Sequence, residues 1–193
     1  SNFVNSLAKF SGGAIYIDGK NAKVKDSNFT NSSIIGVQYA GVVPRGGAIY
    51  IKADDAVVEG SIFNYSSVQD ADTIKGEGGA IFIEGDDARI VGSEFDSSRA
   101  YDGGAIYLKK AQRCNVSDST FWNSYAAYRG GAMYSTGSYS TVYNSNFTYN
   151  LAELSGGAIY WYGGSSATDK SQYNTVDGCI FTNNTAHGNI TND

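Results

Sequence analysis

The stretch Gly-Gly-Ala-Ile-Tyr-Ile at residues 46–51 recurs along the chain with little change. Its first four residues, with Met once in place of Ile, begin at Gly12, Gly46, Gly78, Gly103, Gly130 and Gly156. These starts are 34, 32, 25, 27 and 26 residues apart. A period of this size, kept through most of a chain, indicates stacked structural repeats rather than one globular core. Binding sites are then expected on the long faces of the stack.

Phenylalanine recurs in step with this motif, at Phe3, Phe29, Phe63, Phe95, Phe121, Phe147 and Phe181. Before each of the last six, a β-branched residue stands five positions back and a Ser or Cys two positions back. Three positions back stands Asp, Gly or Asn, the residue types that tolerate a left-handed backbone turn. The pattern predicts that equivalent residues stack on one another in successive coils.

Each repeat predicts three short strands, because apolar and polar residues alternate over short runs bounded by turn residues. The Gly-Gly motif forms the first strand, the β-branched residue lies in the second, and Ser-x-Phe forms the third. We therefore predict an all-β, parallel β-helix of about 6.5 coils, spaced about 4.8 Å apart. Residues 1–193 form one domain, with loop insertions near 32–45, 66–77 and 163–173.

The first strand has two apolar faces, and we expect its Ile face to point inward with the phenylalanines. The opposite face then carries an aromatic stripe, from which the candidate contact residues are Tyr16, Tyr50, Tyr107, Tyr134 and Tyr160. An exposed stripe of this kind can hold a glycan or another protomer. Alternatively, an aromatic ladder only stabilises its sheet.

The first two insertions both lie between the phenylalanine and the next Gly-Gly, so they should leave the solenoid at the same corner. The first is unusually apolar, and its candidate contact residues are Ile35, Tyr39 and Val42. Insertions on one edge of a solenoid are common binding elements. The alternative is that both loops simply pack against the solenoid.

Composition excludes several classes of protein. The net charge is −5, from 14 basic and 19 acidic residues, and the basic residues are scattered, so nucleic-acid binding is not expected. No apolar run reaches transmembrane length. The abundance of Gly (24) and Tyr (15), with one Met and one His, suits an extracellular β-structure.

The two cysteines, Cys114 and Cys179, are expected to be free, buried thiols. Their repeats are two coils apart, which implies roughly 10 Å along the axis. A disulfide requires Cα atoms within about 7 Å.

Seven Asn-x-Ser/Thr sequons are candidate N-glycosylation sites, at Asn28, Asn31, Asn64, Asn115, Asn146, Asn183 and Asn189. A chain rich in Asn, Ser and Thr also produces such sequons by chance, so their presence alone does not establish glycosylation.

The densest acidic group lies at equivalent turns of adjacent coils and comprises Asp54, Asp55, Glu84, Asp86 and Asp87. It could form a calcium site or a catalytic carboxylate pair. An ordinary solvated turn is favoured, because the same turn carries Lys109 and Lys110 in another coil. The single histidine, His187, stands near the irregular last repeat. We therefore expect no catalytic set, no metal and no cofactor.

The Gly-Gly-Ala-Ile motif is paired with Phe-x-x-Asn, complete at residues 147–150 and 181–184. This pairing resembles the repeats of polymorphic outer membrane proteins and of adhesin-like surface proteins in methanogenic archaea and some protists. The resemblance implies a right-handed β-helix at a cell surface, in proteins regarded as adhesins. It supplies no catalytic or binding residues.

These observations predict a non-catalytic, extracellular, adhesin-like protein that attaches to a cell-surface protein or glycan. The main alternative is a structural subunit of an extracellular filament or cell envelope, whose partners are other copies of itself. A polysaccharide-active enzyme is the third reading, for which the sequence offers no clear acid–base set.

Overall fold

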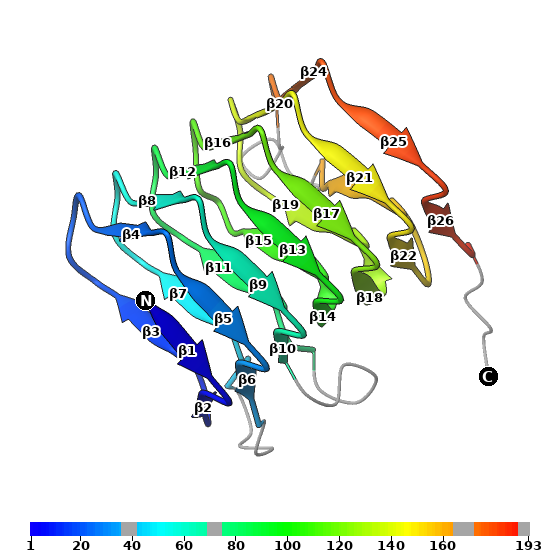
Figure 1. Cartoon of the computed structure of the whole chain (residues 1–193). Coiled ribbons are helices and arrows are strands. Elements are labelled where there is room, and N and C mark those ends of the chain that lie inside the picture. The colour runs from blue at the N-terminus through cyan, green and yellow to red at the C-terminus, as the bar shows by residue number, and fades with distance from the viewer. Residues whose placement is uncertain (36–41, 69–74, 164–171, 189–193) are drawn as a thin grey trace.

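The computed structural model describes residues 1–35, 42–68, 75–163 and 172–188. In these ranges the chain forms 26 strands, all in parallel pairs, and no helix long and apolar enough to span a membrane. The coils stack along one axis, with the first residues at one end of the rod and the last at the other (Figure 1). The predicted parallel β-helix is therefore confirmed.

The strands form four sheets that run the length of the rod. Sheet A contains β1 (Asn2–Val4), β5 (Asn28–Thr30), β9 (Ile62–Asn64), β13 (Glu94–Asp96), β17 (Thr120–Trp122), β21 (Asn146–Thr148) and β25 (Ile180–Thr182). Sheet B contains β2 (Leu7–Ala8), β6 (Ser33–Ile34), β10 (Ser67–Val68), β14 (Arg99–Asp102), β18 (Tyr125–Arg129), β22 (Leu151–Ala152) and β26 (Thr185–Ala186).

The other two sheets contain six strands each. Sheet C contains β3 (Ile15–Ile17), β7 (Ile49–Ile51), β11 (Ile81–Ile83), β15 (Ile106–Leu108), β19 (Met133–Ser135) and β23 (Ile159–Trp161). Sheet D contains β4 (Lys23–Lys25), β8 (Val57–Glu59), β12 (Arg89–Val91), β16 (Asn115–Ser117), β20 (Thr141–Tyr143) and β24 (Thr175–Asp177). In Figure 1 sheet A faces the viewer and sheet D runs along the upper edge.

The prediction of three strands per coil is wrong, because sheet B adds a fourth. The chain enters sheet B through a residue two positions after each ladder phenylalanine, and that residue is left-handed in all seven repeats. The φ angle there is 55° at Tyr65 and 55° at Tyr149. The residue type at this corner varies among Asn, Ser and Tyr, and tyrosine does not signal a turn, so the recurring corner was not predicted.

The corner three positions before each phenylalanine was predicted correctly. All six residues there have positive φ, from 46° at Asp26 to 60° at Gly178. A left-handed residue reverses the local twist and bends the chain from sheet D into sheet A. The residue types Asp, Asn and Gly adopt this conformation at the smallest steric cost.

Each position of the Gly-Gly pair requires glycine for a different reason. Gly46 has a φ of 65°, which an L side chain rarely adopts. Gly47 has no positive φ, but a Cβ there would lie 2.0 Å from the carbonyl oxygen of Gly79 in the next coil. The pair therefore allows one corner both to turn and to stack closely.

The core is filled by the predicted ladders. The rings of successive phenylalanines stack with centroids between 4.6 and 5.0 Å apart. Phe29 is 0% exposed and Phe95 is 1% exposed. The same interior is lined by the β-branched residues five positions before the phenylalanines, which we call the Val ladder, and by Ile49 and Ile81. This arrangement confirms that the Ile face of sheet C points inward.

The Phe-x-x-Asn motif closes the core at the corner between sheets A and B. Asn150 is 0% exposed, and its Nδ2 donates to the Phe121 carbonyl at 3.0 Å. Its Oδ1 accepts a hydrogen bond from the Ser124 backbone N–H at 3.0 Å. Asn184 repeats the first contact by donating to the Phe147 carbonyl at 2.8 Å. The motif thus joins one coil to the coil before it.

Both insertions expected at one corner do connect the same pair of sheets. The range 32–45 includes β6 and leads on to β7, and the range 66–77 includes β10 and leads on to β11, so each runs from sheet B to sheet C. The insertion at 163–173 runs instead from sheet C to sheet D. Parts of all three insertions, and Tyr39, lie outside the described residues.

Both cysteines are free. Cys114 is buried, and burial raises the pKa of its thiol to about 12. Cys179 is only partly buried, so the expectation of a buried thiol is correct for Cys114 alone.

Candidate functional site

The aromatic stripe predicted on the first strand lies on the outer side of sheet C. Its rings are in contact along the rod, with centroids 4.7 to 5.5 Å apart. We call it the outer aromatic ladder, and it comprises Tyr16, Tyr50, Phe82, Tyr107, Tyr134 and Tyr160. From Tyr50 to Tyr160 the ladder forms an apolar cluster of its own, separate from the core.

The expectation that this ladder is exposed is wrong for most of its length. Tyr50 is 6% exposed, and Tyr107 and Tyr134 are each 5% exposed. Tyr16 remains open at 49% exposure, and Tyr160 is partly buried. These values leave Tyr50, Tyr107 and Tyr134 little surface to offer a partner.

Long charged side chains help to cover the ladder. The Arg45 guanidinium lies 5.0 Å from the centre of the Phe82 ring, and the Lys109 ammonium lies 5.8 Å from it. Cations in such positions are attracted to the ring face, and their aliphatic stems cover apolar surface. This cover was not predictable from the spacing of the repeats, because the cations come from other strands and corners.

The residue before each Gly-Gly pair belongs to a second ladder, which the sequence reasoning missed. These residues pair in register from coil to coil, and we call them the corner ladder: Ser11, Arg45, Glu77, Asp102, Arg129 and Ser155. Its residues alternate among Ser, Arg, Glu and Asp, so no single recurring residue type reveals it. Its fixed place beside the Gly-Gly motif is the signal that could have done so.

In the first half of the corner ladder, Arg45 and Glu77 are both ion-paired. Glu77 binds Arg45 at 2.9 Å and Lys109 at 3.1 Å, and Arg45 also lies 3.5 Å from Glu84. The Tyr50 hydroxyl donates to Glu84 at 2.5 Å. Burial, together with Glu84, raises the pKa of Tyr50 well above its usual range. This half therefore forms a closed polar network over the aromatic rings.

The second half surrounds one arginine with tyrosines. The Arg129 guanidinium lies 4.3 Å from the centre of the Tyr128 ring, 5.2 Å from Tyr160 and 5.9 Å from Tyr162. Its Nη2 donates to the Tyr128 hydroxyl at 3.1 Å, and Tyr128 stacks on Tyr101 at 5.1 Å.

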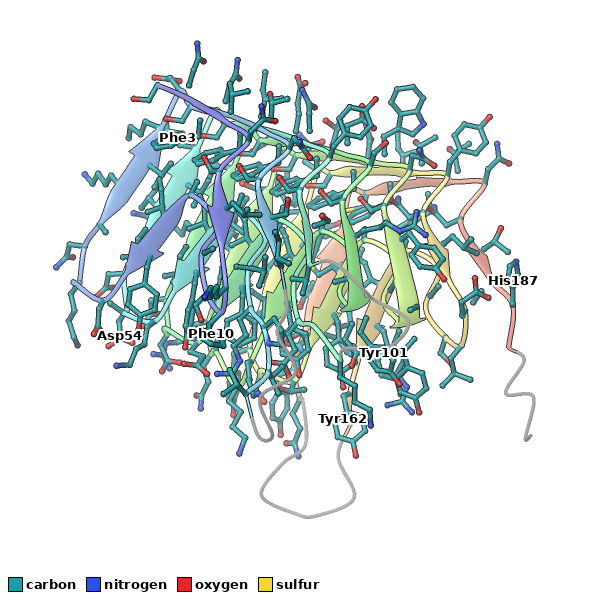
Figure 2. All side chains as sticks on the ribbon, turned by 90° about the horizontal axis from the view of Figure 1, so that it is seen from below. Phe3, Phe10, Asp54, Tyr101, Tyr162 and His187 are labelled. Carbon is teal, nitrogen blue, oxygen red and sulfur yellow. The ribbon has the colours of Figure 1, made fainter. Side chains whose placement is uncertain are left out.

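With Asp102, these residues form what we call the Arg129 patch: Tyr101, Asp102, Tyr128, Arg129, Tyr160 and Tyr162. All of them are partly exposed. Figure 2 shows Tyr101 and Tyr162 on the outside of the rod.

Asp102 is the acidic residue of this patch, and its pKa is strongly shifted. Burial raises the pKa of its carboxyl to about 7, against the opposing effect of Arg129. Within the described part of the chain, its Oδ1 and the Nε of Arg129 are buried without hydrogen-bond partners. Buried polar groups are nearly always paired, so these two atoms are exceptional within the patch.

Two candidate residues of the first insertion are exposed as expected. Ile35 is 42% exposed and Val42 is 46% exposed, on either side of the undescribed residues 36–41. Tyr39 lies between them and outside the described residues.

The acidic turns are held by ion pairs and backbone contacts. Asp54 binds Lys20 at 2.7 Å and accepts a hydrogen bond from the Asp86 backbone at 3.0 Å. The hydrogen bond from Lys20 lowers the pKa of Asp54. Arg113 binds Asp87 at 2.7 Å and Asp86 at 3.2 Å. Among the described residues, no three His, Cys, Asp or Glu side chains converge as metal ligands would.

The sequons are unevenly distributed over the faces. Five of their asparagines lie on the outer side of sheet A or at its following corner: Asn28, Asn31, Asn64, Asn146 and Asn183. Asn115 lies on sheet D, and Asn189 falls outside the described residues.

Comparison with known proteins agrees with this architecture. A family model described as "Right handed beta helix region" matches residues 12–193. No curated protein and no solved structure matches the chain. The match also supports the right-handed coil that the resemblance implied. The chain belongs to the right-handed β-helix family.

Proposed function

We propose that this chain is a non-catalytic, adhesin-like protein that binds a cell-surface glycan or protein in the extracellular space. The Arg129 patch is its contact surface, and the observation that carries the proposal is the arginine held among partly exposed tyrosines. Of the contact residues expected from the sequence, Tyr160 belongs to this patch.

The composition of the patch favours recognition. Tyrosine and arginine are enriched among the residues that dominate binding energy at interfaces. Tyrosine rings offer apolar faces and phenol groups that form hydrogen bonds, a combination that suits the mixed surface of a sugar. The partly exposed guanidinium of Arg129 adds charged hydrogen-bond donors to the same patch.

The ionic contacts favour binding over catalysis. Glu77 and Asp102 are adjacent in the corner ladder and are the carboxyls that an acid–base mechanism would require. Glu77 is held by both Arg45 and Lys109, so it is a poor base or nucleophile. Reducing-sugar release from a polysaccharide panel, abolished by Glu77→Gln, would contradict the non-catalytic assignment.

The test is Arg129→Ser, a change that the repeat itself makes at Ser11 and Ser155. Lys23→Thr is the matched control, because Thr141 and Thr175 occupy its slot on sheet D and the charge change is the same. We expect Arg129→Ser to weaken binding in glycan-array and cell-attachment assays about tenfold or more, and Lys23→Thr to leave it unchanged. Equal binding by the two variants would remove the patch from the proposal.

A structural subunit is the second candidate, which one observation favours. Val176, Ile180 and Phe181 are 39%, 60% and 47% exposed, whereas Val142 and Phe147, one coil earlier, are 0% exposed. A further coil stacked there, from this chain or another copy, would cover Val176 and Phe181, which occupy the slots of Val142 and Phe147. Fibres of uniform width in negative-stain microscopy of the native material would support this role, and dispersed rods would oppose it.

A further inference from the structure

A shallow groove lies on the outer side of sheet A, between β17 and β21. Its volume is about 420 Å³, and its walls are formed by Thr120, Phe121, Trp122, Asn146, Thr148 and Tyr149. Trp122 and Tyr149 are each 54% exposed. The groove thus presents two aromatic side chains beside hydroxyl and amide groups.

The repeat does not require these aromatic residues. In the slot of Trp122, neighbouring coils carry Asp96 and Thr148. In the corner slot of Tyr149, they carry Asn123 and Asn183, which have φ angles of 53° and 51°. Small polar residues therefore satisfy the fold at both places, and two half-exposed aromatic side chains call for another explanation.

Asn146 lies in the same groove and begins the sequon Asn146-Phe147-Thr148. It is exposed and pairs in register with Thr120, while Trp122 pairs with Thr148. Asn146 and Trp122 are thus diagonal neighbours on one face, within reach of large side chains. A group attached to Nδ2 of Asn146 would emerge beside the indole ring.

We propose that Asn146 is N-glycosylated and that the groove between Trp122 and Tyr149 holds the first sugars of that glycan. This proposal is independent of the function assigned to the Arg129 patch. The apolar face of a sugar ring packs on the aromatic side chains, and its hydroxyl groups reach Thr120 and Thr148. Because the glycan is tethered, a weak contact is enough to keep the groove filled.

The attachment uses a lipid-linked oligosaccharide diphosphate as donor. The Nδ2 atom of Asn146 bonds to the anomeric carbon of the first sugar, and the bond from that carbon to the phosphate oxygen breaks. The amide loses one proton to a base of the transferase, and the lipid diphosphate leaves. No electrons are exchanged, so no oxidant or reductant is required.

The chain contains a matched control at Asn28. It begins the same Asn-Phe-Thr sequon, lies in the same strand slot and is also exposed. In the preceding coil its neighbours are Asn2 and Val4 in place of Thr120 and Trp122. A glycan on Asn28 therefore has no indole beside it, so the two sites separate the effect of attachment from the effect of packing.

The experiment uses the full chain secreted from a eukaryotic cell line that N-glycosylates. Peptide mass spectrometry measures occupancy, and thermal unfolding compares Asn146→Thr and Asn28→Thr, each alone and combined with Trp122→Thr. Threonine is the repeat's own residue at Thr120 and at Thr148, so these variants keep the fold. The same variants made in a bacterial host without this modification report the effect of the substitutions alone.

We expect Asn146 to be occupied and Asn146→Thr to lower Tm by about 3 °C in the glycosylated protein only. The loss should disappear in the Trp122→Thr background, and Asn28→Thr should not change Tm. An unoccupied Asn146 overturns the proposal. An equal loss with and without Trp122 also overturns it, because attachment rather than packing would then be responsible.

Discussion

At the scale of single residues, Asp102 is the group most sensitive to pH. Its pKa is about 7 in the folded chain, against an ordinary value of 3.8. Between these values the folded chain holds a proton that the unfolded chain has released, so stability falls as pH rises through this window. The full difference corresponds to at most about 4 kcal/mol.

We predict that Asp102→Asn flattens the pH dependence of stability. The wild-type chain should be less stable at pH 8 than at pH 5, and the variant should lose most of this difference in urea titrations at the two pH values. Three other carboxyls with shifted pKa values do not contribute to this pH dependence: Asp54, Glu59 and Asp87. Their pKa values are lowered, so they stay ionised between pH 5 and pH 8. A variant with the wild-type slope would show that Asp102 is not the responsible group.

At the scale of strands and sheets, the second glycine of each motif sets how closely the coils approach. A Cβ at Gly79 would lie 2.0 Å from the Gly104 carbonyl oxygen and 2.6 Å from that of Arg99. Both contacts are with backbone, so no side chain can move aside. Gly19 differs, because a Cβ there would meet nothing within 4 Å.

We predict that Gly79→Ala destabilises the chain by about 3 kcal/mol or more and that Gly19→Ala changes stability by less than about 0.5 kcal/mol. Chemical denaturation of the two variants measures the difference. The argument fails if both alanines are tolerated equally, since the coils could then separate at little cost.

Repetition made the register of these sheets predictable from the sequence. The Phe, Val and Ile ladders and the corner at Asp26 follow from residue types that recur at fixed spacing. The fourth sheet does not, because a two-residue strand such as Ser33–Ile34 is too short to show alternation. Its corner at Tyr65 is imposed by the stacked coils rather than by the residue itself.

The candidate site was less predictable for a related reason. Exposure of Tyr107 depends on side chains from other coils and corners, which the spacing of repeats does not describe. The corner ladder joins Glu77, Asp102 and Arg129, three unlike residues that become neighbours only when the coils stack. Comparing the repeats for recurring residue types therefore identifies the core positions but not the residues of the candidate site.

At the scale of the whole molecule, the two proposed surfaces occupy different sides of the rod. The Arg129 patch lies where sheet B meets sheet C, while five of the six described sequon asparagines lie on sheet A or its following corner. A glycan on the outer side of sheet A points away from sheet C. The rod can therefore carry glycans without covering its proposed contact surface.

A solenoid also distributes stability along its length, because each coil contacts only its neighbours. Phe95 is 1% exposed and stacks on rings at 4.8 and 4.7 Å, one on each side. Phe181 is 47% exposed and stacks on Phe147 at 5.0 Å. The two residues occupy the same slot, so any difference between them reflects position along the rod rather than local sequence.

We predict that Phe95→Ala costs about 4 kcal/mol and that Phe181→Ala costs less than half as much. Denaturant titration followed by circular dichroism measures both. A large, enclosed cavity forms at Phe95, whereas the site of Phe181 is already open to water. Equal losses would mean that Phe181 is covered in solution, and a concentration-dependent loss at Phe181 alone would identify that cover as a second copy of the chain.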